Sequence, residues 1–149
     1  MNENLENRLF AKGINPTAMR LLVLEYLLQQ PSAVSLSNLE KYFHYSDRTT
    51  LFRTLKTFEE KGLLHQIKDG TDSTKYALCA TACQDSKHTD SHLHFYCTSC
   101  RETFCLPGTS IPQIILPDNF MVKELNLVAT GICNACTANN ATMLHDYSQ

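Results

Sequence analysis

The chain has 149 residues, of which 43% are hydrophobic and 19% are charged, and this composition is typical of a folded globular protein. No apolar run approaches the roughly 20 residues of a membrane-spanning helix, and Met1–Asn4 is not the basic start of a secretion signal, so we expect a cytoplasmic protein. The formal net charge of −2 argues against capture of nucleic acid by bulk electrostatics alone.

The first two expected helices follow from their start and stop signals. Leu5–Lys12 predicts a short helix that ends at Gly13. A stronger helix opens at Asn15 and Pro16, because asparagine caps helices and proline fits the first helical turn. Its apolar stripe stops before the next proline, at residue 31.

Two more helices are expected before residue 62. Ser35 or Ser37 caps the third helix, and Ser37 with Glu40 has the spacing of a capping box. Ser46 caps the fourth helix, which we expect from Asp47 to Lys61, with a glycine directly after it.

Two short strands, Leu63–Lys68 and Thr74–Leu78, follow around an Asp69-Gly70 turn signal. Helices followed by a hairpin predict a winged helix-turn-helix, in which the fourth helix enters the major groove of DNA. Residues 1–76 hold ten of the thirteen Lys and Arg residues, so we expect DNA binding there. Each chain can make few phosphate contacts, so we expect a dimer, which doubles their number.

The rest of the chain predicts a small β-rich part. Strands are expected at His92–Tyr96, Thr103–Leu106 and Met121–Thr130, with one or two helical turns at Ile111–Leu116. We therefore expect an α+β protein in four segments: a DNA-binding domain at 1–79, a hinge at 80–91, a metal-binding α/β dimerisation domain at 92–138 and a flexible tail at 139–149.

Two Cys-x-x-Cys pairs stand out among seven cysteines. Cys97 with Cys100, and Cys133 with Cys136, each follow a strand-like run. Four thiolates brought together form a closed tetrahedral zinc site, which is structural because no position stays open for chemistry. The alternative, four buried free thiols, is disfavoured by the repeated spacing.

His92 and His94 lie on one face of the first of these strands, whereas Cys97 falls on the other. One strand can thus serve two different metals, although a polar outer face would also explain the histidine pair. A DNA-binding domain followed by a segment with metal-ligand residues indicates a metal-responsive regulator of transcription.

The residues resemble the ferric uptake regulator family, in order, from about Gly13 to Cys136. The matching motifs are Thr17-x-x-Arg20, Thr50-Leu51-Phe52-Arg53, Glu60-Lys61-Gly62-Leu63-Leu64, Tyr76, His92-x-His94-x-x-Cys97-x-x-Cys100 and Gly131-Ile132-Cys133-x-x-Cys136. Membership implies a homodimer that binds a palindromic double-stranded DNA operator and represses metal-uptake or stress genes when metal is bound. We therefore expect that the protein is not an enzyme, has no small-molecule substrate and does not bind a membrane.

The resemblance also indicates which residues contact DNA. Phe52 stands where the family usually has tyrosine, and its ring can still pack on thymine methyl groups. The expected DNA-binding residues are Thr17, Arg20, Arg48, Thr49, Thr50, Phe52 and Arg53.

The resemblance further implies a regulatory metal site that includes the His-x-His pair. Iron and peroxide sensors of the family add a histidine and an acid at positions that are Ala33 and Ala77 here. His65 and Cys79 instead match ligand positions of the zinc uptake regulators. The expected set is His65, Cys79, His92 and His94, with His88 and Cys105 as spare candidates. Nitrogen and sulfur ligands favour Zn²⁺, giving one structural and one regulatory zinc, with Fe²⁺ or Mn²⁺ as alternatives.

Three other functions remain open. The chain could be an iron, manganese or peroxide sensor of the same family with an atypical site. It could be a thiol-disulfide redox protein, although its first Cys pair lies between strands and not at a helix N-terminus. It could also be a zinc-stabilised protein-interaction module.

Overall fold

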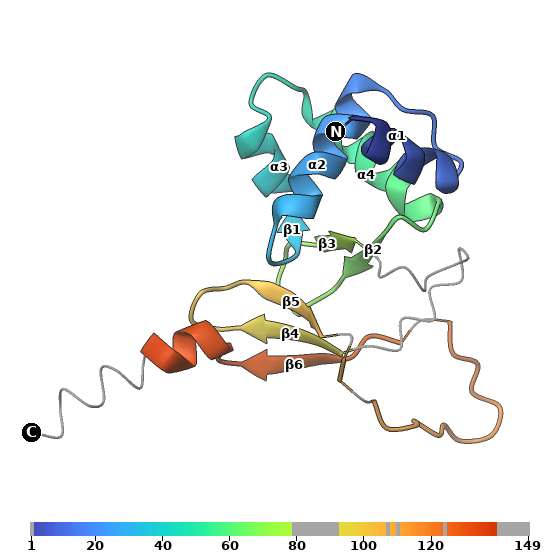
Figure 1. Cartoon of the computed structure of the whole chain (residues 1–149). Helices are drawn as coiled ribbons and strands as arrows, with labels where there is room; N and C mark the ends of the chain where they lie inside the picture. Colours follow the sequence, from blue (N-terminus) through green and yellow to red (C-terminus); the bar gives the residue numbers. More distant parts are fainter. Residues whose placement is uncertain (1, 79–92, 107, 110, 124, 140–149) are drawn as a thin grey trace, which may run out of the picture.

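The structure, a computed structural model, describes residues 2–78, 93–106, 108–109, 111–123 and 125–139 (Figure 1). Its elements are α1 (Asn2–Ala11), α2 (Ala18–Gln29), β1 (Val34–Ser35), α3 (Leu36–Tyr42), α4 (Arg48–Glu60), β2 (Leu64–Ile67), β3 (Lys75–Leu78), β4 (Leu93–Cys97), β5 (Thr103–Leu106) and β6 (Val128–Gly131). A short helix of residues 134–139 follows β6. The predicted α+β class is confirmed. Within the described ranges, no helix is long and apolar enough to cross a membrane.

The hydrophobic core lies in the N-terminal part, between the four helices and the first sheet. Leu24 of α2, Leu39 of α3, and Leu55 and Phe58 of α4 are completely buried in it. Every buried residue of this core falls between Leu9 and Tyr76. The N-terminal part therefore supplies most of the apolar burial, which is the dominant favourable contribution to folding.

The helices form where predicted, and Ser35, one of the two expected caps of α3, is confirmed, but the expected caps of α2 and α4 are wrong. Thr17, not Asn15, caps α2, and its side chain accepts the Arg20 N–H at 3.3 Å, so Pro16 lies before the helix. The expected capping box of Ser37 and Glu40 is replaced by one that Ser35 forms with Asn38. Several neighbouring polar side chains can cap, and the backbone entry into each helix decides between them.

Asp47 replaces Ser46 as the cap of α4. Its carboxylate accepts the Thr50 N–H at 2.6 Å, and this hydrogen bond lowers the pKa of Asp47. The helix ends as expected, because Gly62 has φ of +72° and adopts the left-handed conformation that follows many helices.

The first sheet has the antiparallel order β1-β3-β2. The hairpin was predicted, and His65 in β2 pairs with Ala77 in β3. The short strand β1 was missed, because two residues carry no periodicity; its Val34 pairs with Tyr76.

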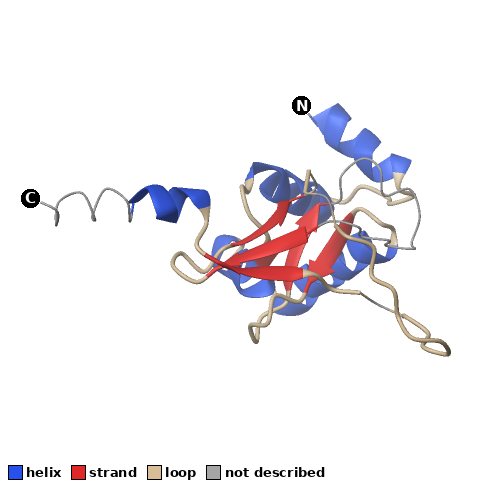
Figure 2. Cartoon of the chain, turned by 90° about the horizontal axis from the view of Figure 1, so that it is seen from below, coloured by secondary structure: helices blue, strands red, loops and turns tan. Residues whose placement is uncertain are grey.

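The second sheet has the order β5-β4-β6, with β4 antiparallel to β5 and parallel to β6. Figure 2 shows its strands on the near side with helices behind them, while the helix at the N-terminus and the one near the C-terminus lie to the sides of the sheet. Two predictions here are wrong: residues 111–116 form no helical turn, and the last strand starts at Val128 instead of Met121. Prolines at 107, 112 and 117 favour extended, irregular backbone in this stretch.

The two sheets meet along β5, which lies next to the β2–β3 hairpin (Figure 1). The Thr103 hydroxyl donates to the Asp69 carboxylate at 2.6 Å, and the Thr103 carbonyl accepts the Ala33 N–H at 2.8 Å. The Ser32 hydroxyl donates to Glu102 at 2.6 Å. These hydrogen bonds fix the orientation of the second sheet against the helical part.

Asp69 should make stability depend on pH. Burial alone would raise its pKa, but hydrogen bonds from Thr103, Thr71 and Lys75 outweigh burial and hold the pKa below its ordinary value. A depressed folded-state pKa gives a stabilisation that is present above the unfolded value of about 4 and is lost as the pH falls further. We expect Asp69→Asn to lower the free energy of unfolding by about 1–3 kcal/mol near pH 7. The difference from the unmodified chain should narrow below about pH 4.

Urea unfolding of both chains over a pH series measures this difference. Both carry the same cysteines, so the loss of metal in acid affects them alike. A difference that stays constant with pH would contradict the role assigned to the charged form of Asp69.

Candidate functional site

The two Cys-x-x-Cys pairs meet at one edge of the second sheet. Because β4 and β6 are parallel, their carboxyl ends lie side by side, and Cys97 pairs with Gly131. Cys133 therefore comes directly beside Cys97, and its N–H donates to the Cys97 sulfur at 3.3 Å. Cys97 and Cys133 are buried, whereas Cys100 is exposed.

The four sulfur atoms fit a tetrahedral metal site. All of them lie within 4.8 Å of one another, and Cys100 and Cys133 have their sulfurs 3.9 Å apart. A Zn–S distance of about 2.3 Å in a tetrahedron implies sulfur separations of about 3.8 Å. The predicted cysteine cluster thus has the dimensions of a four-thiolate site.

The pKa values of these thiols are also consistent with the binding of a cation. Burial would raise the pKa of Cys97, but backbone N–H groups, of Cys100 first, outweigh it and lower that pKa to about 6. A backbone N–H from Glu102 favours the Cys100 thiolate, yet burial and the neighbouring sulfurs raise its pKa to about 12. One thiolate forms readily and the next does not, because burial and hydrogen bonds with the neighbouring sulfurs favour the protonated Cys100 thiol. A bound divalent cation deprotonates thiol ligands.

A second cluster joins the two sheets. The Nε2 atoms of His65, in β2, and His94, in β4, are 3.3 Å apart, and the Cys105 sulfur of β5 is 3.4 Å from His65 Nε2. His94 and Cys105 are direct cross-strand partners. Both histidines are buried, at 3% and 5% exposure, so the cluster lies within the junction.

This cluster is compatible with a metal ion of the zinc type. Its three ligand atoms lie within 4.8 Å of one another. Zinc–nitrogen distances of about 2.0–2.1 Å in a tetrahedron imply nitrogen separations of about 3.3 Å. Imidazole and thiolate suit Zn²⁺ better than the oxygen-preferring Mn²⁺.

The structure brings together only part of the predicted regulatory set. His65 and His94 meet, whereas Cys79, His92 and the spare candidate His88 lie outside the described residues. Cys105, a spare candidate by sequence, takes the third position. His94 and Cys97 serve different clusters from opposite faces of β4, as their spacing predicted.

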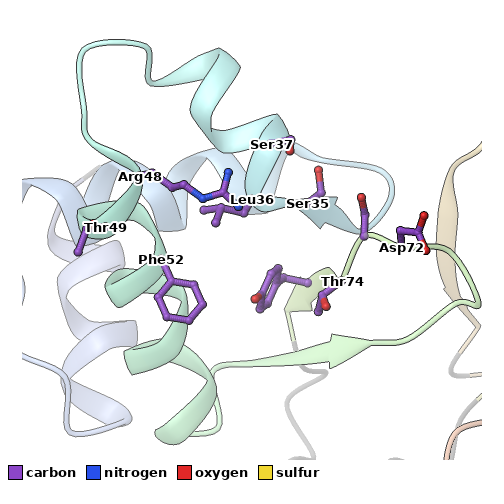
Figure 3. A pocket seen from close by; sticks show the side chains of 10 residues that line it. Ser35, Leu36, Ser37, Arg48, Thr49, Phe52, Asp72 and Thr74 are labelled. Carbon is purple, nitrogen blue, oxygen red and sulfur yellow. The ribbon is translucent and has the colours of Figure 1, made fainter.

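A cleft of about 530 Å³ separates α4 from the hairpin (Figure 3). Arg48, Thr49 and Phe52 line its helical side, and Thr74 lies opposite on the hairpin. Phe52 is 43% exposed, which leaves its ring available for contact. The first turns of α4 thus present polar side chains and one exposed aromatic ring beside an open cleft.

The other predicted DNA contacts differ in their surroundings. Arg48 donates to the carboxylate of Glu40 at 3.1 and 3.2 Å through one of its guanidinium nitrogens, and its side chain is largely exposed. Arg53 is exposed on α4, one turn after Thr49. Thr50 is exposed in the first turn of α4. Thr17 and Arg20 lie away from the cleft at the start of α2, where Arg20 also donates to the Asn15 carbonyl at 2.8 Å.

A sequence profile described as the Ferric uptake regulator family matches residues 11–127, which span both parts of the molecule. The chain belongs to this family. Its members are DNA-binding, metal-responsive regulators of transcription and not enzymes. The family assignment excludes the thiol-disulfide redox function considered from the Cys-x-x-Cys pairs.

Two curated relatives of this ferric uptake regulator family member carry different names. A "Ferric uptake regulation protein" of Synechococcus elongatus is 27% identical over 143 residues, covering 89% of this chain and 92% of that protein. A "Peroxide operon regulator" of Bacillus subtilis is 26% identical over 133 residues, covering 84% and 86%. The names of these relatives are consistent with the family, but they do not identify the metal that this chain binds.

Solved structures agree with the fold. A zinc uptake regulator complexed with zinc and DNA has a TM-score of 0.65 and 22% identity, covering 94% of this chain and 97% of that one. The ferric uptake regulator of Vibrio cholerae has a TM-score of 0.56 and 21% identity, covering 86% and 98%. At these identities the likeness shows a shared fold for this family member.

Proposed function

We propose that this protein is a zinc-responsive repressor of metal-uptake genes. The observation that supports the metal is the meeting of His65 from the hairpin with His94 and Cys105 from the second sheet. The set has two imidazoles, one thiol and no carboxylate, and this softness favours Zn²⁺. Cys79 or His92 is proposed as a fourth ligand, since Cys79 directly follows β3, the partner strand of β2, and His92 directly precedes β4.

The position of the cluster explains how a metal can act on DNA binding. A zinc ion there would tie the hairpin, which borders the DNA-binding cleft, to the second sheet. His65, His94 and Cys105 come from three strands, so they gather only when the two sheets are in this orientation. Zinc can favour this orientation only by binding it more tightly than the alternatives, as in any population shift.

The four-cysteine cluster is proposed as a structural zinc site. It joins the last residue of β4, Cys97, to residues that come after β4 and β6, at the carboxyl ends of these two parallel strands. The protein would then carry two zinc ions per chain with separate roles.

We further propose a homodimer that binds a palindromic operator in the cytoplasm. Exposed apolar side chains gather in the loop between β5 and β6, where Ile115 is 84%, Phe120 67% and Met121 91% exposed. Such an apolar segment marks an interaction site, and a second copy is the partner that a family of dimeric regulators implies. Two recognition helices also double the phosphate contacts of a chain with net charge −2.

The experiment that tests zinc sensing compares metals in DNA binding. Protein with its structural zinc is titrated with Zn²⁺, Mn²⁺ or, without oxygen, Fe²⁺, against DNA selected from a random-sequence pool. We expect Zn²⁺ to increase DNA affinity at the lowest free metal concentration. Activation by Fe²⁺ or Mn²⁺ but not Zn²⁺ would instead support an iron, manganese or peroxide sensor.

The DNA surface gives a separate prediction. Arg53→Ala should weaken operator binding by roughly 5- to 150-fold, the effect of losing an arginine contact of about 1–3 kcal/mol. Arg8→Ala, which removes an exposed arginine from α1, is the matched control and should change affinity little. Fluorescence anisotropy with labelled operator measures both. Equal affinities for all three proteins would show that Arg53 does not contact the operator.

A further inference from the structure

Polar groups are concentrated at the junction of the two sheets. Among the described residues, the buried polar or charged ones are Ser35, Thr54, His65, Asp69, His94 and Thr103. Four of these six lie at the junction, and only His65 and His94 belong to the proposed metal site. The remaining pair, Asp69 and Thr103, needs a separate explanation, because a buried carboxylate costs stability unless it is hydrogen-bonded.

Asp69 gathers its partners from both sheets. Its side chain is completely buried and accepts from Thr71 and from Lys75 Nζ at 3.0 Å within the hairpin. The Thr103 hydroxyl of β5 donates to it at 2.6 Å. The Lys75 ammonium also lies 5.8 Å from the ring centre of Tyr96 in β4, a cation–π contact across the same junction.

Thr103 also bonds the helical part through its backbone. Its carbonyl accepts the Ala33 N–H at 2.8 Å, in the connection between α2 and β1. Next to it, Glu102 accepts the Ser32 hydroxyl at 2.6 Å. The start of β5 thus contacts two separate segments of the DNA-binding part without using any of the cysteines or histidines.

The register of β5 relates these contacts to the metal cluster. Thr103 and Cys105 are two residues apart, so they point to the same face of the strand. Thr103 contacts Asp69, just after β2, while Cys105 contacts His65 within β2. Any orientation that keeps the Asp69–Thr103 hydrogen bond therefore also holds Cys105 close to His65.

We infer that Asp69 and Thr103 form a metal-independent latch that positions the two sheets for metal-coupled DNA binding. This inference rests on the proposed function for its effect on zinc response, but the latch itself is a property of the chain. The latch raises the fraction of zinc-free protein in which His65, His94 and Cys105 already lie together. The apparent affinity for zinc scales with that fraction, so the latch lowers the zinc concentration at which the protein responds.

The test uses Thr103→Val, which removes the hydroxyl and keeps the shape of the side chain. Asp69→Asn is the second variant, and Thr130→Val, at the exposed position of β6, is the matched control. In the full chain with Cys105→Ser, which keeps the four-cysteine cluster, we measure hydrogen exchange of the Ala33 amide. We expect Thr103→Val to increase this exchange about tenfold and Thr130→Val to leave it unchanged. Unchanged exchange in both latch variants would overturn the inference.

The second readout uses the chain with Cys105 intact. We expect the Zn²⁺ concentration for half-maximal DNA binding to rise about tenfold in Thr103→Val, while DNA affinity at saturating Zn²⁺ stays within about twofold. If Thr103 only stabilised the fold, Thr103→Val would reduce the DNA affinity at saturating Zn²⁺ as well as the apparent affinity for zinc. Faster Ala33 exchange with no zinc response in any chain would refute the proposed function and leave the latch standing. Faster exchange with an unshifted zinc midpoint would show that the latch does not position the metal site.

Discussion

Replacing Cys133 by serine should remove one zinc ion per chain and unfold the second sheet while the helical part stays folded. The buried hydrophobic residues of the described part beyond Tyr76 are Cys97 and Cys133 alone. A sheet with so little apolar burial depends on its metal, and structural zinc contributes about 10–16 kcal/mol in small domains. Loss of one thiolate should weaken zinc binding by more free energy than the net stability of the sheet, so the sheet should unfold.

Metal analysis of the purified chain, with hydrogen exchange of residues 93–97 and 128–131, measures both effects. The matched control is Cys105→Ser, the same substitution in β5, which should keep the tightly held zinc and the protection of the sheet. If Cys133→Ser retained its zinc and its protected amides, the structural role of the four-cysteine cluster would be refuted.

Replacing His94 by alanine should empty the second metal site and abolish the response of DNA binding to zinc. His94 supplies one of three ligands that the described residues bring together, and its Nε2 lies 3.3 Å from that of His65. Substitutions of residues that merely support a ligand cost 10- to 100-fold in metal affinity, so loss of a ligand should cost more than about 100-fold. Competition with a zinc-binding dye measures the affinity of the second site.

Two further variants separate ligand loss from general damage. His44→Ala removes an exposed histidine beyond the end of α3 and should leave zinc affinity and DNA binding unchanged. His94→Cys keeps a soft ligand and should restore part of the zinc response. Retention of the second zinc by His94→Ala, with the melting temperature unchanged, would exclude His94 as a ligand.

The helical part could be predicted from the sequence because its signals are local. Apolar residues at helical spacing placed α2, α3 and α4, and Gly62 ended the last of them. The caps were less predictable, since Ser46 and Asp47 are adjacent and both accept hydrogen bonds. Strand β1 was missed because only its pairing with β3 makes it a strand.

Local residue spacing in the sequence predicted parts of both metal-ligand clusters. Repeated Cys-x-x-Cys pairs predicted the four-cysteine cluster, and strand alternation separated His94 from Cys97. Cys105 could have been placed by extending the β4–β5 hairpin, because a turn that pairs Tyr96 with Thr103 also pairs His94 with Cys105.

The latch had no comparable signal. In the sequence, Asp69 indicates only a turn, and Thr103 indicates only a position in a strand. Their contact depends on how two sheets, far apart in the sequence, pack against each other. The helical turns expected at 111–116 and the strand start expected at Met121 are wrong, because apolar side chains suggested regular elements where the prolines favour irregular backbone.

The most direct test of the central claim is the zinc content of the wild-type chain measured together with DNA affinity over a range of free Zn²⁺. We predict two zinc ions per chain, one retained throughout and one that binds over the same concentration range in which DNA affinity rises. A single tightly held zinc, with DNA affinity independent of added Zn²⁺, would contradict zinc sensing at the junction of the two sheets.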